Sequence, residues 1–154
     1  MPKSEIFSLH TPLPLARARQ IIQAALAHGR EQSLMPLTVV VLDSGGHAIA
    51  MEREDGAGVV RQQVATGKAW GALGMGIGSR TIGARNQGRE AFMAGVAAAS
   101  DGQFIPVPGG VLVLEKGEAI GAVGISGDTS DADEACAIAG IEAAGYSTGI
   151  DTSD

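Results

Sequence analysis

The stretch that decides the fold lies in the last third of the chain and reads VPGGVLVLEKGEAIGAVGISGDTSDADEACA, residues 107–137. A Pro-Gly-Gly turn leads into the apolar run Val111–Glu115, and a Lys-Gly turn leads into a second run, Ala119–Ser126. Short β-branched runs joined by a glycine turn predict an antiparallel hairpin. Ser130 and Asp133 resemble a capping box, which predicts that a helix follows the hairpin.

The first half of the chain predicts a second hairpin. Leu37–Leu42 is a short β-branched run, Asp43–Gly46 has the composition of a tight turn, and His47–Glu52 follows as the returning strand. Phe104–Val107 predicts one more strand before the Pro-Gly-Gly turn. Apolar residues at helical spacing predict three helices around the hairpins: Thr11–Gly29, with Thr11 as N-cap and Pro12 at the first position, Val59–Met75, and Thr81–Ser100.

These elements predict an α+β fold. Hairpin-linked strands form antiparallel sheets, and the helices before, between and after them must cover the apolar faces of the sheet. We expect a single domain over residues 1–146 and a flexible, polar C-terminal tail over residues 147–154.

Bulk composition excludes several classes of function. With 45% hydrophobic and 18% charged residues among 154, the chain has the composition of a globular domain with a substantial core. A formal net charge of −6 argues against binding to nucleic acid or to an anionic membrane surface. No apolar run approaches the roughly 20 residues of a membrane span, and residues 1–10 lack the apolar core of a secretory signal. The single cysteine, Cys136, rules out an intrachain disulfide, so we expect a buried thiol and a cytoplasmic protein.

Several residues are candidates for binding an anionic ligand. Arg53 and Asp55 end the first hairpin, and Lys68 follows in the next predicted helix. A guanidinium and an ammonium group together would hold a carboxylate, whereas a charged run at a strand end is usually a solvated surface. The pair Gly109-Gly110 either forms only a tight turn or exposes backbone amides to a ligand.

The histidines and the acidic residues point to less specific chemistry. His47 follows a turn, and its imidazole either belongs to the hairpin alone or ligates a metal or a haem iron. The three histidines include no pair four residues apart, so we expect no structural metal site. Four carboxylates, at Asp128, Asp131, Asp133 and Glu134, lie at the start of the last predicted helix, where they interact favourably with its dipole.

Taken together and in order, the motifs resemble the GlcG/HbpS family, which includes the C-terminal domain of PduO-type proteins. The resemblance covers nearly the whole chain after residue 37 and rests on six stretches: VVVLDSGGH (39–47), EREDGA (52–57), GKA (67–69), VPGGV (107–111), IGAVGISG (120–127) and DEACA (133–137). It implies a profilin-like, three-layer α/β/α fold with a five-stranded antiparallel sheet. It also implies a homo-oligomer, with the glycine-rich helices at subunit contacts.

The resemblance leaves three functions open. The first is a haem- or tetrapyrrole-binding oligomer, with Arg53 and Lys68 on the propionates and His47 or His28 as the axial ligand. The second is a cofactor-independent enzyme of a catabolic operon, an isomerase, lyase or hydratase in which Lys68 or Asp43 moves a proton on a small carboxylate. The third is a non-catalytic accessory or scaffold subunit. We rank haem binding first, and we expect these residues at the ligand: Arg53, Asp55, Lys68, Pro108, Gly109, Gly110 and Glu134.

Overall fold

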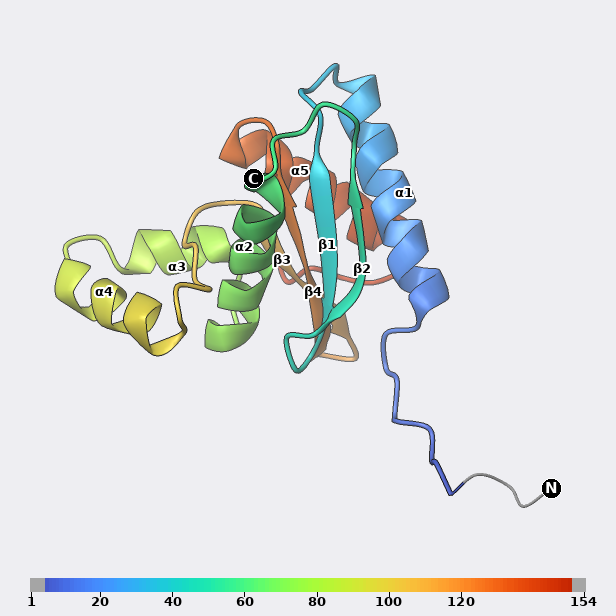
Figure 1. Ribbon diagram of the computed structural model, residues 1–154, viewed down its shortest axis with the longest axis horizontal. Helices are drawn as coiled ribbons and strands as arrows, with labels where there is room; N and C mark the ends of the chain where they lie inside the picture. Colours follow the sequence, from blue (N-terminus) through green and yellow to red (C-terminus); the bar gives the residue numbers. More distant parts are fainter. Residues whose placement is uncertain (1–4, 151–154) are drawn as a thin grey trace.

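The computed structural model describes residues 5–150, and Figure 1 shows a sheet with helices on both of its faces. Two hairpins provide the strands, and three helices lie between the hairpins. The elements in chain order are α1 (Leu15–Glu31), β1 (Thr38–Asp43), β2 (Ala48–Arg53), α2 (Arg61–Met75), α3 (Ser79–Arg85), α4 (Glu90–Ala99), β3 (Gly110–Glu115), β4 (Glu118–Ser126) and α5 (Ser130–Ala143).

The sheet has the strand order β2-β1-β4-β3, and every pair of neighbours is antiparallel. Both predicted hairpins, β1–β2 and β3–β4, are confirmed. The first strand of one hairpin pairs with the second strand of the other, so Thr38 of β1 lies opposite Ser126 of β4. The two central strands, β1 and β4, are almost entirely buried, in agreement with their continuous apolar sequence.

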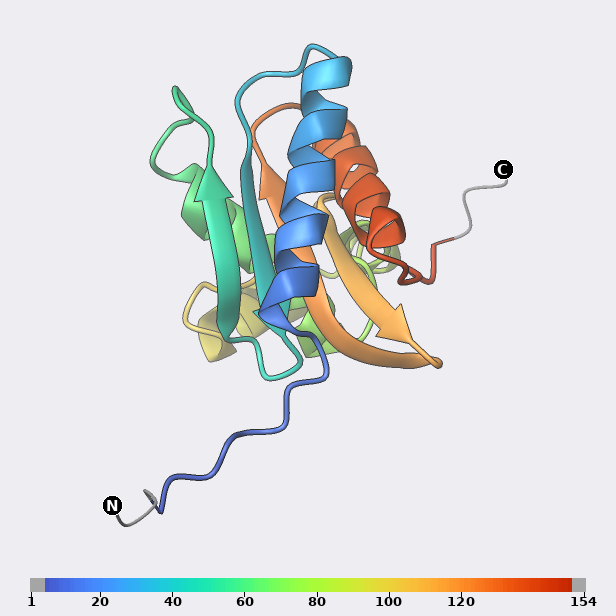
Figure 2. The same cartoon turned by 90° about the vertical axis from the view of Figure 1, so that its right-hand side faces the viewer.

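The helices form two layers of unequal size. α1 and α5 pack side by side on one face of the sheet, and α2 lies across the other face (Figures 1 and 2). The larger core lies under α1 and α5 and includes Ile21, Val39 and Ile141, whereas the core under α2 is built mainly from alanines and from Val40 and Leu42. The predicted α+β class with an antiparallel sheet is confirmed.

The expectation of a fifth strand is wrong for the described residues, where the sheet has four strands. The segment Phe104–Val107 crosses α2 instead of joining the sheet, because the amide of Ile105 donates to the carbonyl of Gly67 at 3.2 Å. Pro106 lacks an amide hydrogen, so this segment is also poorly suited to a ladder of strand hydrogen bonds.

Three details of the predicted helices are also wrong. The stretch Thr81–Ser100 is not one helix, because it is broken between α3 and α4 at Gly88, whose φ of +77° suits glycine. The first helix begins at Leu15 after Pro14, and the hydroxyl of Thr11 instead donates to the carbonyl of Leu9. The N-cap of α5 is Thr129, which accepts a hydrogen bond from the amide of Ala132 at 3.2 Å.

The last described residues, 147–150, lie beside the edge strand β3. Ser147 exchanges two backbone hydrogen bonds with Leu114, at 2.8 and 3.1 Å, and the side chain of Thr148 is buried. Residues 147–150 of the expected tail are therefore packed against the sheet in the structure, and residues 151–154 lie outside the described part. None of the helices within residues 5–150 combines the length and the apolar character that crossing a membrane requires.

Candidate functional site

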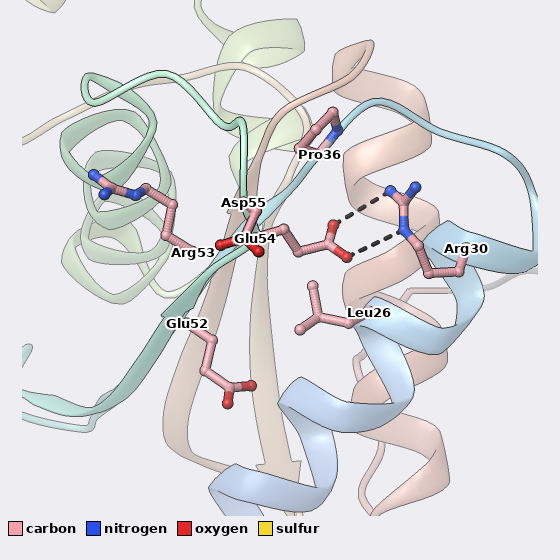
Figure 3. Close-up of a pocket in the computed structure, with 7 residues that line it drawn as sticks. All are labelled: Leu26, Arg30, Pro36, Glu52, Arg53, Glu54 and Asp55. Carbon is pink, nitrogen blue, oxygen red and sulfur yellow. Dashed lines mark hydrogen bonds and ion pairs between the residues drawn. The ribbon is translucent and has the colours of Figure 1, made fainter.

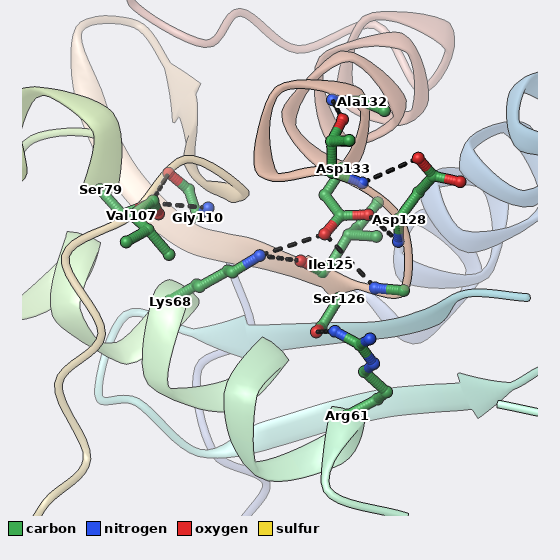
Figure 4. Close-up of polar contacts among 12 residues, drawn as sticks. Arg61, Lys68, Ser79, Val107, Gly110, Ile125, Ser126, Asp128, Ala132 and Asp133 are labelled. Atoms are coloured by element: carbon green, nitrogen blue, oxygen red, sulfur yellow. Dashed lines mark hydrogen bonds and ion pairs between the residues drawn. The ribbon is translucent and has the colours of Figure 1, made fainter. Parts of the chain in front are cut away.

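A buried ion pair joins α2 to α5. The Nζ of Lys68 lies 3.2 Å from Oδ2 of Asp133 and donates a hydrogen bond of 2.9 Å to the carbonyl of Ile125 (Figure 4). The carboxylate of Asp133 also accepts hydrogen bonds from the amides of Gly127 and Asp128, at 3.3 and 3.0 Å. Lys68 thus binds the end of β4 and the start of α5 to α2.

Both charges of this pair are almost inaccessible to solvent, with 3% of the Lys68 side chain and 1% of the Asp133 side chain exposed. Burial lowers the pKa of Lys68 and raises the pKa of Asp133, and the attraction between the two charges opposes both shifts. An amine with a lowered pKa is a common feature of proton-transfer sites. The Lys68 amine, however, is occupied by two protein acceptors and cannot be reached by a substrate in this conformation.

The glycine pair of the Pro-Gly-Gly turn does lie beside Lys68, as expected. A Cβ on Gly109 would come within 2.8 Å of the Lys68 Nζ, and one on Gly110 would overlap the Lys68 backbone carbonyl. The amide of Gly110 donates to Oγ of Ser79 at 2.8 Å and points at no open space. These glycines therefore allow β3 and α2 to approach closely, which explains the sequence without a ligand.

Arg53 and Asp55, at the end of β2, line a hollow of ≈ 600 Å³ next to Pro36 (Figure 3). Inside this hollow, Glu54 pairs with Arg30 at 3.1 Å and accepts a hydrogen bond from the amide of Leu37. The side chain of Arg53 points away from that pair, as the alternation of β2 requires. Within residues 5–150, no hydrogen bond or ion pair joins Arg53 to Lys68 or to the glycine turn.

Glu134 at the start of α5 is held by Arg80 of α3. The Nε of Arg80 donates to both carboxylate oxygens of Glu134, at 3.0 and 3.1 Å, and its Nη2 also pairs with Asp131. The hydrogen bonds that Arg80 donates to Asp131 and Glu134 raise its pKa. This arrangement ties α3 to α5, and it is a structural role for an acid that we expected at the ligand. Pro108, the last of the residues expected at the ligand, is half-buried in the turn directly before Gly109.

The tip of the first hairpin carries a carboxylate–imidazole pair. The Oδ1 of Asp43 accepts hydrogen bonds of 2.9 Å from the amides of Gly45 and His47 and lies 3.3 Å from the His47 Nδ1. Partial burial opposes the effect of these contacts, but together they lower the pKa of Asp43. The imidazole ring is 81% exposed and is oriented by the carboxylate behind it.

His47 faces a second hollow, of ≈ 310 Å³, between this hairpin and the segment that precedes α1. Its walls include His10 and the apolar side chains of Leu9, Leu15 and Ile49. A mainly apolar concavity with a few polar groups is the usual form of a small-molecule site. His10, which the sequence did not single out, lies here because the N-terminal segment runs past the hairpin tip.

The other sequence candidates do not join either hollow. His28 is half-buried on α1 and lines neither of them. Cys136 is buried as expected. Desolvation and, to a smaller extent, the charge of nearby Asp133 raise its pKa to about 11. In the described part of the chain, no three His, Cys, Asp or Glu side chains are grouped in a way that would hold a metal ion.

Asp43 and Lys68, the two candidates for proton transfer, lie at opposite ends of the sheet. Asp43 is the last residue of β1 and pairs with Gly121, whereas Lys68 contacts β4 at Ile125, beside the partner of the first residue of β1. No local sequence pattern indicates that Lys68 and Asp133 pair, because 65 residues separate them.

Comparisons with known proteins agree with this architecture. The model of the family "Haem degrading protein HbpS-like" matches residues 13–142. The protein GlcG of Escherichia coli K12 is 33% identical over 113 residues, which cover 71% of this chain and 80% of GlcG. An uncharacterised 15.0 kDa protein from the dhaT-dhaS intergenic region of Citrobacter freundii is 31% identical over 121 residues, covering 79% of this chain and 84% of its own length.

The fold also resembles that of a solved structure. The crystal structure of the PduOC:heme complex superposes with a TM-score of 0.80 at 26% identity and covers 88% of this chain and 97% of PduOC. Because the family model matches residues 13–142, which is most of the sequence, the chain belongs to the HbpS-like family.

Proposed function

We propose that this protein binds haem in the hollow between the β1–β2 hairpin and the segment before α1, with His47 as the axial ligand. The observation that carries the proposal is the Asp43–His47 pair at the edge of an apolar concavity. The family match and the haem complex of a relative with the same fold support haem as the ligand.

The residues present fit a haem group chemically. Because the Nδ1 of His47 faces the Asp43 carboxylate, the ring presents Nε2 outward, the nitrogen that would ligate iron. A carboxylate behind a ligating histidine fixes the tautomer and the orientation of the ring. Leu9, Leu15 and Ile49 would contact the porphyrin plane, and His10 lies on the same hollow as a second imidazole.

Bound haem would supply an iron centre whose reactivity depends on its axial ligand and on the polarity of its surroundings. The chain's own part in this proposal is limited to holding the ring. His47 would ligate the iron, Asp43 orients His47, and the apolar residues before α1 would keep water from one side of the bound ring. The carboxylate of Asp43 stays ionised at neutral pH, because its pKa is lowered by the hairpin amides despite partial burial.

Titration with hemin tests this proposal. The wild-type protein should shift the Soret band with saturation near one hemin per chain, and His47→Ala should weaken binding by about tenfold or more. His28→Ala is the matched control, since His28 lines neither hollow. An unchanged Soret titration for His47→Ala, or a loss in His28→Ala alone, would remove His47 from the site. No Soret shift in the wild type would refute haem binding itself.

The alternative of an enzyme acting on a small carboxylate has less support from the geometry. Lys68 is buried and paired with Asp133, and Asp43 lies at the other end of the sheet, so these two candidates for proton transfer do not face a shared hollow. The propionate role proposed for Lys68 meets the same difficulty. Asp55 and Arg53, at the rim of the hollow near Pro36, remain accessible.

We also propose that the chain self-associates through α4. This helix consists mostly of alanine and other apolar residues, yet none of its residues is buried, and Phe92 is 45% exposed. Because small side chains allow helices to approach closely, a second copy of α4 is the occupant that fits best. Ala94→Arg should lower the mass measured by sedimentation, whereas Ala27→Arg on the exposed side of α1 should not. A monomeric wild type would contradict the proposal.

A further inference from the structure

A row of polar side chains crosses the sheet at the end opposite the His47 hairpin. Thr38, the first residue of β1, pairs with Arg53 of β2 on one side and with Ser126 of β4 on the other. Directly paired residues of antiparallel strands point to the same face of the sheet. Val40, two residues beyond Thr38, belongs to the core under α2, so the whole row faces α2.

The N-terminus of α2 lies over this row. Arg61, the first residue of the helix, donates from Nη1 to Oγ of Ser126 at 3.2 Å (Figure 4). Val60 at the N-cap provides no side-chain hydrogen bond, and the first turn contains no acidic residue. The first turn of a helix offers amide donors that lack intrahelical acceptors and carries the positive end of the dipole.

Thr38, in the middle of this row, has a buried hydroxyl group without a partner in the part of the chain that the structure describes. Its side chain is fully buried, and its Oγ1 has no hydrogen-bond partner among residues 5–150, although buried hydroxyl groups almost always have one. Neither Arg53 nor Arg61 has a carboxylate within ion-pair distance in the described chain, where the nearby Lys68 is already paired. Among the described residues, two guanidinium groups without an ion-pair partner thus flank a buried hydroxyl group that has no hydrogen-bond partner.

We propose that this row binds a small oxyanion, the carboxylate or phosphate group of a metabolite, between the guanidinium groups of Arg53 and Arg61. Planar guanidinium groups bind both kinds of anion with two parallel hydrogen bonds. The hydroxyl of Thr38 supplies a further donor, and Ser126 orients Arg61. The site lies at the other end of β1 from Asp43 and does not depend on the proposed haem site.

An NMR titration of the full chain with inorganic phosphate and, separately, with malonate tests the proposal at constant ionic strength, with chloride as the reference anion. We expect saturable shifts of the amides of Thr38, Ser126 and the first turn of α2. The stronger of the two probes identifies the group that the site prefers. Arg61→Gln and Arg53→Gln should each weaken binding by about tenfold. Arg19→Gln, an exposed arginine of α1 on the other face of the sheet, should leave it unchanged.

Thr38→Val keeps the shape of the side chain and removes the hydroxyl, so it separates a binding role from a structural one. If the hydroxyl contacts the anion, this variant should fold normally and bind about threefold more weakly. Shifts that are equal for phosphate, malonate and chloride would overturn the proposal. So would a saturable shift that Arg61→Gln and Thr38→Val leave unchanged.

Discussion

Replacing Lys68 with methionine should destabilise the fold by an amount that depends on pH. The substitution removes the ammonium group and leaves Asp133 buried, with the amides of Gly127 and Asp128 as its remaining donors. Removing one partner of a buried ion pair costs about 3–5 kcal/mol of unfolding free energy. Because two amide donors remain, we expect a loss at the lower end, about 3 kcal/mol, which is a large share of a typical domain's stability.

The pH dependence follows from the direction of the shifted pKa. Burial already raises the pKa of Asp133, and loss of the Lys68 charge should raise it further. A carboxyl group whose pKa is raised by folding stabilises the folded state below its unfolded pKa, and that contribution is lost as pH rises through the folded pKa. The deficit of Lys68→Met should therefore be smaller near about pH 5 than near about pH 8.

Urea unfolding followed by circular dichroism measures both effects. Lys116→Met is the control, because Lys116 lies exposed in the turn between β3 and β4. The double variant Lys68→Met/Asp133→Leu should recover part of the lost stability, since it leaves no uncompensated charge. A loss below about 1 kcal/mol, or a loss that is the same at both pH values, would refute the account of this ion pair.

Three further outcomes follow from the packing. Gly110→Ala should lower the free energy of unfolding by about 3 kcal/mol or more, because its Cβ would overlap the Lys68 carbonyl. Gly95→Ala, whose Cβ would meet open space, should not destabilise the protein. Equal stabilities of the two variants would contradict the close approach of β3 and α2. Thr129→Ala should lower the free energy of unfolding by about 1 kcal/mol through loss of the N-cap of α5, and Ser130→Ala should lower it by less. A larger loss for Ser130→Ala in thermal unfolding would show that Ser130 is the N-cap. Cys136, buried and with its pKa raised to about 11, should resist iodoacetamide in the folded protein near about pH 8 and react in urea; rapid labelling without urea would show that the helix opens.

The hairpins and most helix positions follow from local sequence. Leu37–Leu42 is a short β-branched run between Pro36 and a glycine turn, and Ala119–Ser126 is a short apolar run after a Lys-Gly turn. These two runs supply most of β1 and β4. The failures come from tertiary contacts that a local pattern does not contain. Phe104–Val107 has the composition of a strand, but its hydrogen-bond partner is a carbonyl of α2.

The candidate site was predictable only in its parts. Lys68 and the glycine turn are in contact, but the reason is close packing between β3 and α2. The partner of Lys68 is Asp133, whose position at a helix start predicts only an interaction with the helix dipole. Thr38 and Ser126 carried no signal at all, since their importance arises from the register of two central strands. The contact between Asp43 and His47 is local, because the turn between them places the carboxylate within reach of the ring.

A structure of the protein with hemin bound tests the central claim most directly. We predict that the iron is ligated by Nε2 of His47, with the porphyrin against Leu9, Leu15 and Ile49 and with Asp43 still on Nδ1 of the ring. Iron ligated by His28, or a porphyrin bound away from this hollow, would contradict the account.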